Sequence, residues 1–251
     1  HVPASDEAWS LQKHFVKFVQ ENWDKPDEGI WEIRGPRRHF THSKVMAWVA
    51  IDRAVKAVEM FDLPGDLEAW KALRETIHAD ICEKAYDKKR GVFTQYYGGE
   101  ALDANCLIIP LVGFLPATDE RVKRTIEAID RELSQDGLIL RYSPEESQHV
   151  DGLPPGEGIF LPCSFWMVDC LKLLGRDEEA ERRLRDLMKL RSPLGLLSEE
   201  YDTKHKRLVG NFPQAFTLVG LVNSVHNLSE EVEGPATLRC RDGGGKKRNS
   251  V

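Results

Sequence analysis

Apolar residues along this chain fall into two kinds of helical segment that alternate. Segments of the first kind are apolar on nearly every face, and they cover residues 41–61, 105–115, 162–174 and 213–228. A helix that is apolar all round lies inside a protein, so these segments predict inner helices. Segments of the second kind repeat apolar residues at a spacing of three and four, and they cover residues 9–23, 66–85, 119–133 and 178–190. They predict outer helices, each followed by an inner one.

The links between these helices differ in length. Links from an inner to an outer helix are short, at residues 62–65, 116–118 and 175–176. Links from an outer to an inner helix are long and rich in Gly, Pro and aromatic residues, at residues 24–40, 86–104, 134–161 and 192–212. In stacked antiparallel helices the long links all lie at one end, and long loops usually carry function. The pattern predicts an all-α fold, an α/α barrel with a loop-rich rim, and leaves an irregular bundle or solenoid as the alternative.

Eight predicted helices do not close a barrel of six helical hairpins. Residues 1–228 are therefore expected to form an incomplete (α/α)6 barrel that lacks its opening helices. Residues 229–251 are acidic and then Gly-rich and basic, a composition that predicts a disordered C-terminal tail.

Charge and cysteine content narrow the class of function. The net charge of −6 argues against nucleic acid as a partner, because phosphate binding requires a basic surface. The apolar runs fall short of the roughly 20 residues needed to span a membrane, so no membrane partner is expected. Five cysteines without a CxxC pair favour a reducing compartment and a cytoplasmic location. His39 and His42 have no further His or Cys at ligand spacing, so no metal site is predicted.

The first long link carries a candidate acid. It reads PDEGIWEIRG over residues 26–35, with Glu32 directly after Trp31. Apolar contact with a tryptophan raises the pKa of a carboxyl group, and a general acid near neutral pH must keep its proton. Arg34 is predicted to bind a substrate hydroxyl or to hold a carboxylate ionised. A surface loop with ordinary ion pairs is the alternative.

Two adjacent carboxylates follow in the fourth long link, which reads GLLSEEYD over residues 195–202. Glu199 and Glu200 are expected at the same rim as Glu32. An inverting glycosidase needs two carboxyl groups about 6.5–9.5 Å apart, with a water between them. Adjacent acids are also common on solvated loops, so the pair by itself leaves both interpretations open.

The third long link holds Arg141 and Tyr142. A guanidinium group hydrogen-bonds to sugar hydroxyls, and a tyrosine ring packs on the face of a sugar. The Gly and Pro residues further along this link fit a turn-rich loop without any binding role.

At these loops the sequence resembles the bacterial branch of glycoside hydrolase family 15, the glucoamylase-like enzymes, which include glucodextranases and some trehalases. The resembling segments run in order along the chain and include residues 26–35, 39–54, 110–119, 151–166, 195–202 and 210–216. The resemblance implies an (α/α)6 barrel that hydrolyses α-linked glucosides with inversion, without a metal or an organic cofactor.

The resemblance also implies roles for individual residues. Glu32 matches the general acid of the family and Glu199 matches the general base. Arg141 and Tyr142 match a pair that contacts the non-reducing glucose. The other residues expected to bind substrate are Trp31, Arg34 and Glu200.

Family members carry an N-terminal β-sandwich and opening barrel helices, which this sequence is expected to lack. The N-terminal region of the same protein is therefore an expected partner, besides an oligosaccharide or disaccharide substrate. The first function we expect is exo-acting release of glucose, as in a glucoamylase. Hydrolysis of trehalose is the alternative within the family, and a non-catalytic helical sugar-binding or scaffold role is the alternative outside it.

Overall fold

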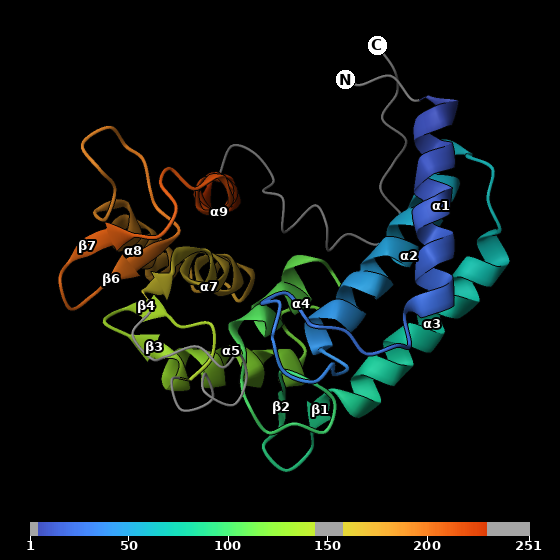
Figure 1. The fold of residues 1–251 in the computed structure, drawn as a ribbon, viewed down its shortest axis with the longest axis horizontal. Coiled ribbons are helices and arrows are strands. Elements are labelled where there is room, and N and C mark those ends of the chain that lie inside the picture. The colour runs from blue at the N-terminus through green and yellow to red at the C-terminus, as the bar shows by residue number, and fades with distance from the viewer. Residues whose placement is uncertain (1–4, 144–157, 230–251) are drawn as a thin grey trace.

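The computed structural model describes residues 5–143 and 158–229, whose helices form an arc (Figure 1). The helices are α1 Asp6–Asn22, α2 Thr41–Phe61, α3 Leu67–Lys84, the 3-10 helix η1 Ala104–Leu107, α4 Ile108–Leu111, α5 Glu120–Glu132, α7 Leu161–Leu173, α8 Asp177–Met188 and α9 Ala215–Leu228. The strands are β1 Tyr86–Asp87, β2 Val92–Phe93, β3 Ser134–Gln135, β4 Leu138–Ile139, β5 Ile159–Phe160, β6 Glu200–Asp202 and β7 Arg207–Val209. Residues 230–251 of the predicted tail and residues 144–157 of the third long link lie outside the described residues.

The predicted alternation of inner and outer helices is confirmed at α2, α7 and α8. The structure departs from it at α9, which is predicted as an inner helix but exposes most of its apolar side chains, because it lies at an open end of the arc (Figure 1). α7 is the central inner helix, since every residue from Leu161 to Leu171 is buried, and it packs against α4, α8 and α9. At the other end of the arc, α2 packs against α1 and α3. The outer helix α8 buries only Ala180, Leu184 and Leu187, which form one stripe at helical spacing. The structure is thus a mostly helical, open part of an α/α barrel.

The second inner helix is shorter than the sequence predicts. The sequence predicts one helix over residues 105–115, whereas η1 is followed by α4, which ends at Leu111. Pro110 has no backbone N–H, and its ring crowds the carbonyl four residues earlier, so it weakens a helix at this point. Gly113, with a φ of 79°, then takes the left-handed conformation at which helices commonly end.

Short antiparallel strands, which the sequence analysis does not predict, shape three of the four long links. β1 pairs with β2, β3 pairs with β4, and β5, β6 and β7 form a three-stranded sheet in that order. Asp136 and Gly137 join β3 to β4 with φ values of 52° and 83°, as a two-residue hairpin turn requires. Strands of two or three residues are too short to show the alternation from which strands are predicted.

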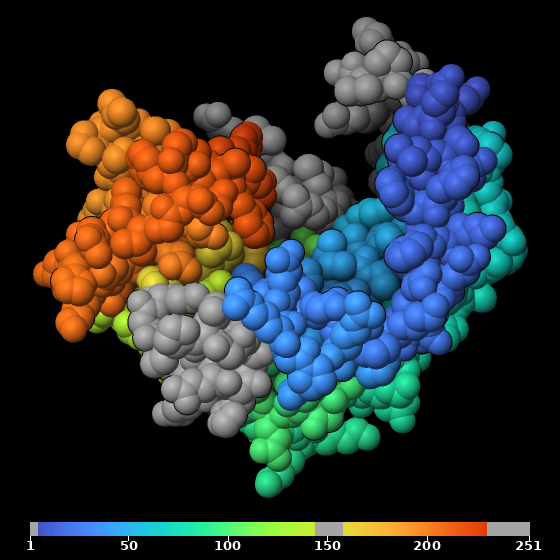
Figure 2. All heavy atoms as spheres, in the orientation of Figure 1, coloured from blue at the N-terminus to red at the C-terminus, as the bar shows by residue number. Residues whose placement is uncertain are grey.

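Helices at the two ends of the arc expose apolar side chains. On α9 these are Phe216, Val219, Val222 and Val225, which are 43%, 54%, 54% and 46% exposed. On α1 they are Leu11, Phe15 and Phe18, which are 56%, 62% and 65% exposed. The two helices lie at opposite ends of the arc, with a hollow between them (Figures 1 and 2). Contiguous exposed apolar side chains of this kind mark surfaces that pack against another element. In the described part of the chain, no helix is long and apolar enough to span a membrane.

The stripe on α9 predicts that the isolated 251-residue chain self-associates. Replacing Val219 and Val222 together by Lys places two charges in the stripe, so the variant should shift toward the monomer in size-exclusion chromatography. Leu194→Lys is the matched control and should leave the elution unchanged, because Leu194 is 84% exposed in a turn outside the stripe. A wild-type chain that elutes as a monomer contradicts the prediction.

Candidate active site

The predicted acid lies in a strained turn. Glu32 has a φ of 52°, a left-handed conformation that costs a residue with a side chain on the order of 1–3 kcal/mol. Its backbone N–H donates to the Gly29 carbonyl at 3.2 Å, and the N–H of Ile33 donates to the Glu28 carbonyl at 2.9 Å. We call residues 28–33 the acid turn. Residues under such strain cluster at active sites, so the acid turn is a candidate functional element.

Two sets of contacts hold the loop that carries the acid turn. The Nζ of Lys44 donates to the carbonyl oxygens of Trp23 and Lys25. Lys44 is 2% exposed, and this burial lowers the pKa of its ammonium group. Further along the loop, Asp27 and Arg38 exchange two backbone hydrogen bonds of 3.0 Å. Because the loop is tied down before and after the acid turn, that turn is fixed relative to α2.

The apolar cover that the sequence predicts for Glu32 is not supplied by the described residues. Glu32 is exposed. The ring of Trp31 packs instead on Phe160 and Trp166, with ring centroids 5.6 and 6.4 Å away. The tryptophan therefore anchors the acid turn to the core rather than shielding the carboxyl group that follows it.

The predicted base, Glu199, is held by one neighbouring segment. Its Oε2 accepts hydrogen bonds from the backbone N–H and the side-chain Nδ2 of Asn211, at 3.0 and 2.9 Å. Its own N–H donates to the Asn211 carbonyl at 2.9 Å. A Cβ atom on Gly210 would lie 3.0 Å from Oε2, so only glycine leaves room for this approach. Oε1 of Glu199 receives no hydrogen bond from the described residues, which leaves it able to accept a proton from a water.

Arg141 joins the segments that carry the acid turn and the base. Its guanidinium carbon lies 5.6 Å from the ring centre of Trp31 and 5.8 Å from those of Tyr142 and Phe160. Its Nη2 lies 3.7 Å from Oε1 of Glu200. Cation–π contacts with partly buried rings contribute about 0.5–2 kcal/mol each. We call these five residues the arginine cluster.

The acid turn and the base meet at the start of α7. Trp31 contacts Phe160 edge to face, at the 5.6 Å given above. Phe160 pairs with Glu200 between β5 and β6, and the N–H of Leu161 donates to the Glu199 carbonyl at 3.1 Å. Segments that are far apart in the sequence are therefore neighbours at the rim: Glu32 follows the residue that makes this contact, and Glu199 takes part in it through its carbonyl oxygen.

Arg34 lies outside the arginine cluster. It is exposed, and no hydrogen bond or ion pair joins it to another residue in the described part of the chain. The residue that the turn buries is Ile33, at 6% exposure, so the next side chain points outward. The binding role predicted for Arg34 stays a prediction.

A buried carboxylate that the sequence analysis does not single out stands behind Trp31. Asp103 is fully buried and accepts hydrogen bonds from the indole Nε1 of Trp31, at 2.9 and 3.1 Å to its two oxygens. It also accepts from Gln95 Nε2 and from the backbone N–H of Asn105, both at 2.8 Å. Burial raises the pKa of Asp103 to about 6. The only signal in the sequence is a single acid at the start of an apolar segment, which also fits a helix cap.

The site contains further aromatic residues that the sequence analysis does not identify. Phe160 and Trp166 contact Trp31, and the ring of Phe216 lies 5.9 Å from Phe160 and 6.0 Å from Trp166. Phe160, Trp166 and Phe216 lie in segments that resemble the family, and their apolar surroundings in the sequence are typical of core residues. Phe160 and Trp166 are each 7% exposed and support the other two rings from behind, so the partly exposed rings of Trp31 and Phe216 form the apolar surface on which a sugar ring can pack.

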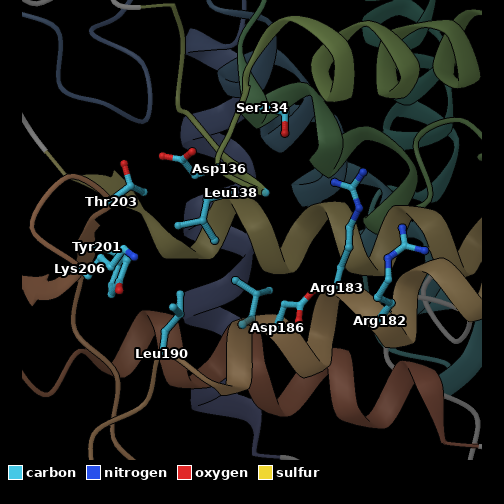
Figure 3. Close-up of a pocket in the computed structure, with 12 residues that line it drawn as sticks. Ser134, Asp136, Leu138, Arg182, Arg183, Asp186, Leu190, Tyr201, Thr203 and Lys206 are labelled. Atoms are coloured by element: carbon cyan, nitrogen blue, oxygen red, sulfur yellow. The ribbon is translucent and has the colours of Figure 1, made fainter.

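A separate cavity of about 550 Å³ lies between the β3–β4 hairpin, α8 and the β6–β7 hairpin (Figure 3). Tyr201 and Arg183 line it, whereas Glu32 and Glu199 do not. Arg183 pairs with Asp130 of α5 at 2.7 Å. This ion pair holds α8 against α5. Because neither predicted carboxylate lines the cavity, the cavity is not the candidate active site.

Groups that bind metals are scattered. Within residues 5–143 and 158–229, no group of three or more His, Cys, Asp or Glu side chains could hold a metal ion. His39 stacks on Tyr97, with ring centroids 5.8 Å apart, and burial lowers the pKa of His42 to about 4. The cysteines of this part of the chain, Cys82, Cys106, Cys163 and Cys170, are free thiols.

The fold is that of an open α/α barrel with long loops at one rim, and the sequence comparisons agree with this class of fold. The family model described as glycosyl hydrolases family 15 matches residues 2–226. The chain belongs to this family. The resemblance that the loop motifs indicated is therefore confirmed.

The similar curated proteins include two named trehalases. The trehalase of Mycolicibacterium smegmatis is 44% identical over 233 residues, a match that covers 92% of this chain and 34% of that protein. The trehalase of Mycobacterium tuberculosis is 45% identical over 230 residues, covering 91% of this chain and 33% of that protein. The chain thus spans about a third of the length of these relatives.

Solved structures with this fold include two glucoamylases. A bacterial glucoamylase complexed with acarbose superimposes with a TM-score of 0.71 at 13% identity, covering 92% of this chain and 40% of that one. The glucoamylase of Saccharomycopsis fibuligera superimposes with a TM-score of 0.67 at 12% identity, covering 86% and 60%. At these identities the similarity establishes the fold alone, and it confirms the predicted barrel architecture.

The raised pKa of Asp103 predicts a pH-dependent stability. A carboxyl group with a pKa of about 6 in the folded state and about 3.9 in the unfolded state binds its proton more tightly when folded. Its contribution to the free energy of unfolding is therefore complete below about pH 4 and lost as the pH rises to about 6, by about 2–3 kcal/mol. Urea unfolding from pH 4 to pH 7 should show this fall relative to Asp103→Asn. Parallel pH curves for the two proteins contradict it.

Proposed function

We propose that this chain carries the acid and the base of an inverting glycoside hydrolase, with Glu32 as the general acid and Glu199 as the general base. The observation that carries the proposal is the meeting of their two segments at Phe160 and Leu161, on the loop-rich rim of the barrel. Since the chain spans about a third of its trehalase relatives, the reaction is assigned to the full-length protein that contains it.

The proposed reaction is a single displacement. Glu32 donates its proton to the glycosidic oxygen as the bond from that oxygen to the anomeric carbon breaks. A water attacks the anomeric carbon from the opposite face, and Glu199 takes the proton that this water loses. The products are a free sugar of inverted configuration and a neutral alcohol. Solvent then restores the proton to Glu32 and removes the other from Glu199, so no cofactor takes part.

The surroundings of the two carboxylates fit these roles. One oxygen of Glu199 accepts hydrogen bonds from Asn211, and the other receives none from the described residues and can take a proton from the attacking water. Glu32 follows a tryptophan that is fixed in the core, so its carboxyl group projects from a rigid turn. The arginine cluster beside them offers a guanidinium group and aromatic rings to a sugar. Precise placement of such groups accounts for much of the rate gain of enzymes.

Trehalose is the substrate that the comparisons favour. The relatives at 44% and 45% identity carry the name trehalase, whereas the glucoamylases are similar at 12–13% identity and inform the fold only. The release of glucose from oligosaccharides, which the sequence analysis placed first, therefore becomes the second candidate. A non-catalytic sugar-binding role has the same aromatic surface in its favour and differs in predicting no turnover.

Replacing either carboxylate should abolish most turnover of trehalose by the full-length protein. Glu32→Gln and Glu199→Gln preserve shape but remove the proton donor or acceptor, so kcat should fall about 10²–10⁴-fold in each. Glu181→Gln is the control, because Glu181 is an exposed carboxylate of α8 that pairs with Arg185 on the same helix. A rate near that of the wild type in either glutamine variant removes that residue from the mechanism.

The anomers formed from trehalose test inversion. Trehalose joins two glucose units through both anomeric carbons in the α configuration, so inversion at one of them releases one β-glucose and one α-glucose. Proton NMR recorded before mutarotation should show equal amounts of the two. The release of α-glucose alone would mean retention and would contradict the assignment of Glu199 as a base.

A further inference from the structure

Asp103 connects parts of the chain that are distant in sequence. It lies in the link that leads into η1, where it caps that helix through the N–H of Asn105. It also binds the Trp31 indole, 72 residues away along the chain, and the amide of Gln95. A helix cap needs neither of these two bonds. A carboxylate at zero exposure is costly to bury, so its position calls for a reason beyond the cap.

The hydrogen bonds require a group that only accepts. The indole N–H, the Gln95 amide and the Asn105 N–H all donate to Asp103. A carboxylate offers two acceptor oxygens to them, whereas an asparagine would turn an NH2 group toward one of these donors. The nearby Arg141 guanidinium counteracts the cost of burying the charge. The donors around Asp103 therefore favour a carboxylate over an amide at this position, although burial itself opposes the charge and raises the pKa to about 6.

The consequence of these bonds falls on the acid turn. Asp103 holds the N–H edge of the Trp31 indole, and Phe160 and Trp166 pack on its ring. With its side chain fixed at two places, Trp31 cannot rotate without breaking a hydrogen bond to a charged group. Glu32 is the next residue and has a left-handed backbone, a conformation that persists only where surrounding contacts enforce it.

We propose that Asp103 is a positioning residue for the general acid: it fixes the Trp31 indole, and through Trp31 it sets the direction in which the Glu32 carboxyl group meets the glycosidic oxygen. This inference rests on the proposed function, because it takes Glu32 as the acid. A shift of the acid by about 1 Å is enough to lower the rate of a positioned proton transfer on the order of 10²-fold. Asp103 itself touches neither substrate nor reacting atoms.

The test compares substrates that depend differently on the acid. Trehalose leaves a sugar alkoxide that needs a proton from Glu32, whereas α-glucosyl fluoride leaves fluoride, which departs with little help. In the full-length protein, Asp103→Asn should lower kcat for trehalose about 10–100-fold, with KM changed little, and should largely preserve kcat for α-glucosyl fluoride. Trp31→Phe keeps an aromatic ring but lacks the N–H, so it should lower the ratio of the trehalose rate to the fluoride rate in the same way even if Asp103→Asn does not fold, since any loss of sugar packing affects both substrates.

Control variants separate the inference from the proposed function. Glu32→Gln should show the same substrate selectivity more strongly. Asp52→Asn removes a carboxylate of similar burial, 2% exposed, whose ion pairs with Lys56 and Arg74 lie on α2 and α3. It should lower stability and leave the ratio of the two rates unchanged.

A second readout does not depend on activity. In protein labelled with 15N in the tryptophan indoles, the Nε1–H resonance assigned through Trp31→Phe should move in Asp103→Asn and stay in place in Asp52→Asn. Equal losses on both substrates in Asp103→Asn and Trp31→Phe, or unchanged trehalose turnover, overturn the positioning role. If Glu32→Gln lowers the rates on trehalose and α-glucosyl fluoride equally, the result contradicts the proposed function instead, because Glu32 would then not be the acid.

Discussion

The candidate site depends on the fixed position of one indole ring. The Trp31 N–H is bound by the buried carboxylate of Asp103, and its ring packs against Phe160 at the start of α7. Together with Arg141, which contacts both Trp31 and Glu200, these contacts hold the acid turn beside the strand that follows Glu199. A hydrogen bond from a neutral donor to an ionised acceptor in a dry site is stronger than one on the surface, so a strained turn can be maintained there.

The sequence predicts the helices well because their signal is local. Apolar residues at helical spacing determine which face of α5 or α8 is buried, and continuous apolar runs identify α7 as an inner helix. The lengths of the links predict that the segments with Glu32 and Glu199 lie at one rim, and in the structure these two segments are neighbours. Pro110 and Gly113 indicate that α4 ends early. The prediction would have to give these two helix-breaking residues more weight than the continuous apolar run around them.

The remaining features follow from contacts between distant segments, which no local pattern encodes. Asp103 reads as a helix cap, and only the fold brings it to an indole 72 residues away. Phe160 and Trp166 read as core residues because their neighbours are apolar on every side. The direction of the Glu32 side chain depends on a left-handed backbone that a non-glycine residue adopts only under tertiary constraint. For the same reason the sequence does not show that Arg34 points away from the cluster.

Because the described part of the chain is an open part of the barrel, the chemistry of the site is best judged from the coupling between its two segments. The most direct measurement is a double-mutant cycle on kcat/KM for trehalose in the full-length protein, with Trp31→Leu and Glu200→Gln. Trp31 and Glu200 both contact Arg141. If the acid turn and the segment that carries the base act as one unit, the effects should deviate from additivity by about 0.5–3 kcal/mol. Additivity to within about 0.5 kcal/mol would mean that the two segments act independently, and it would contradict the central claim.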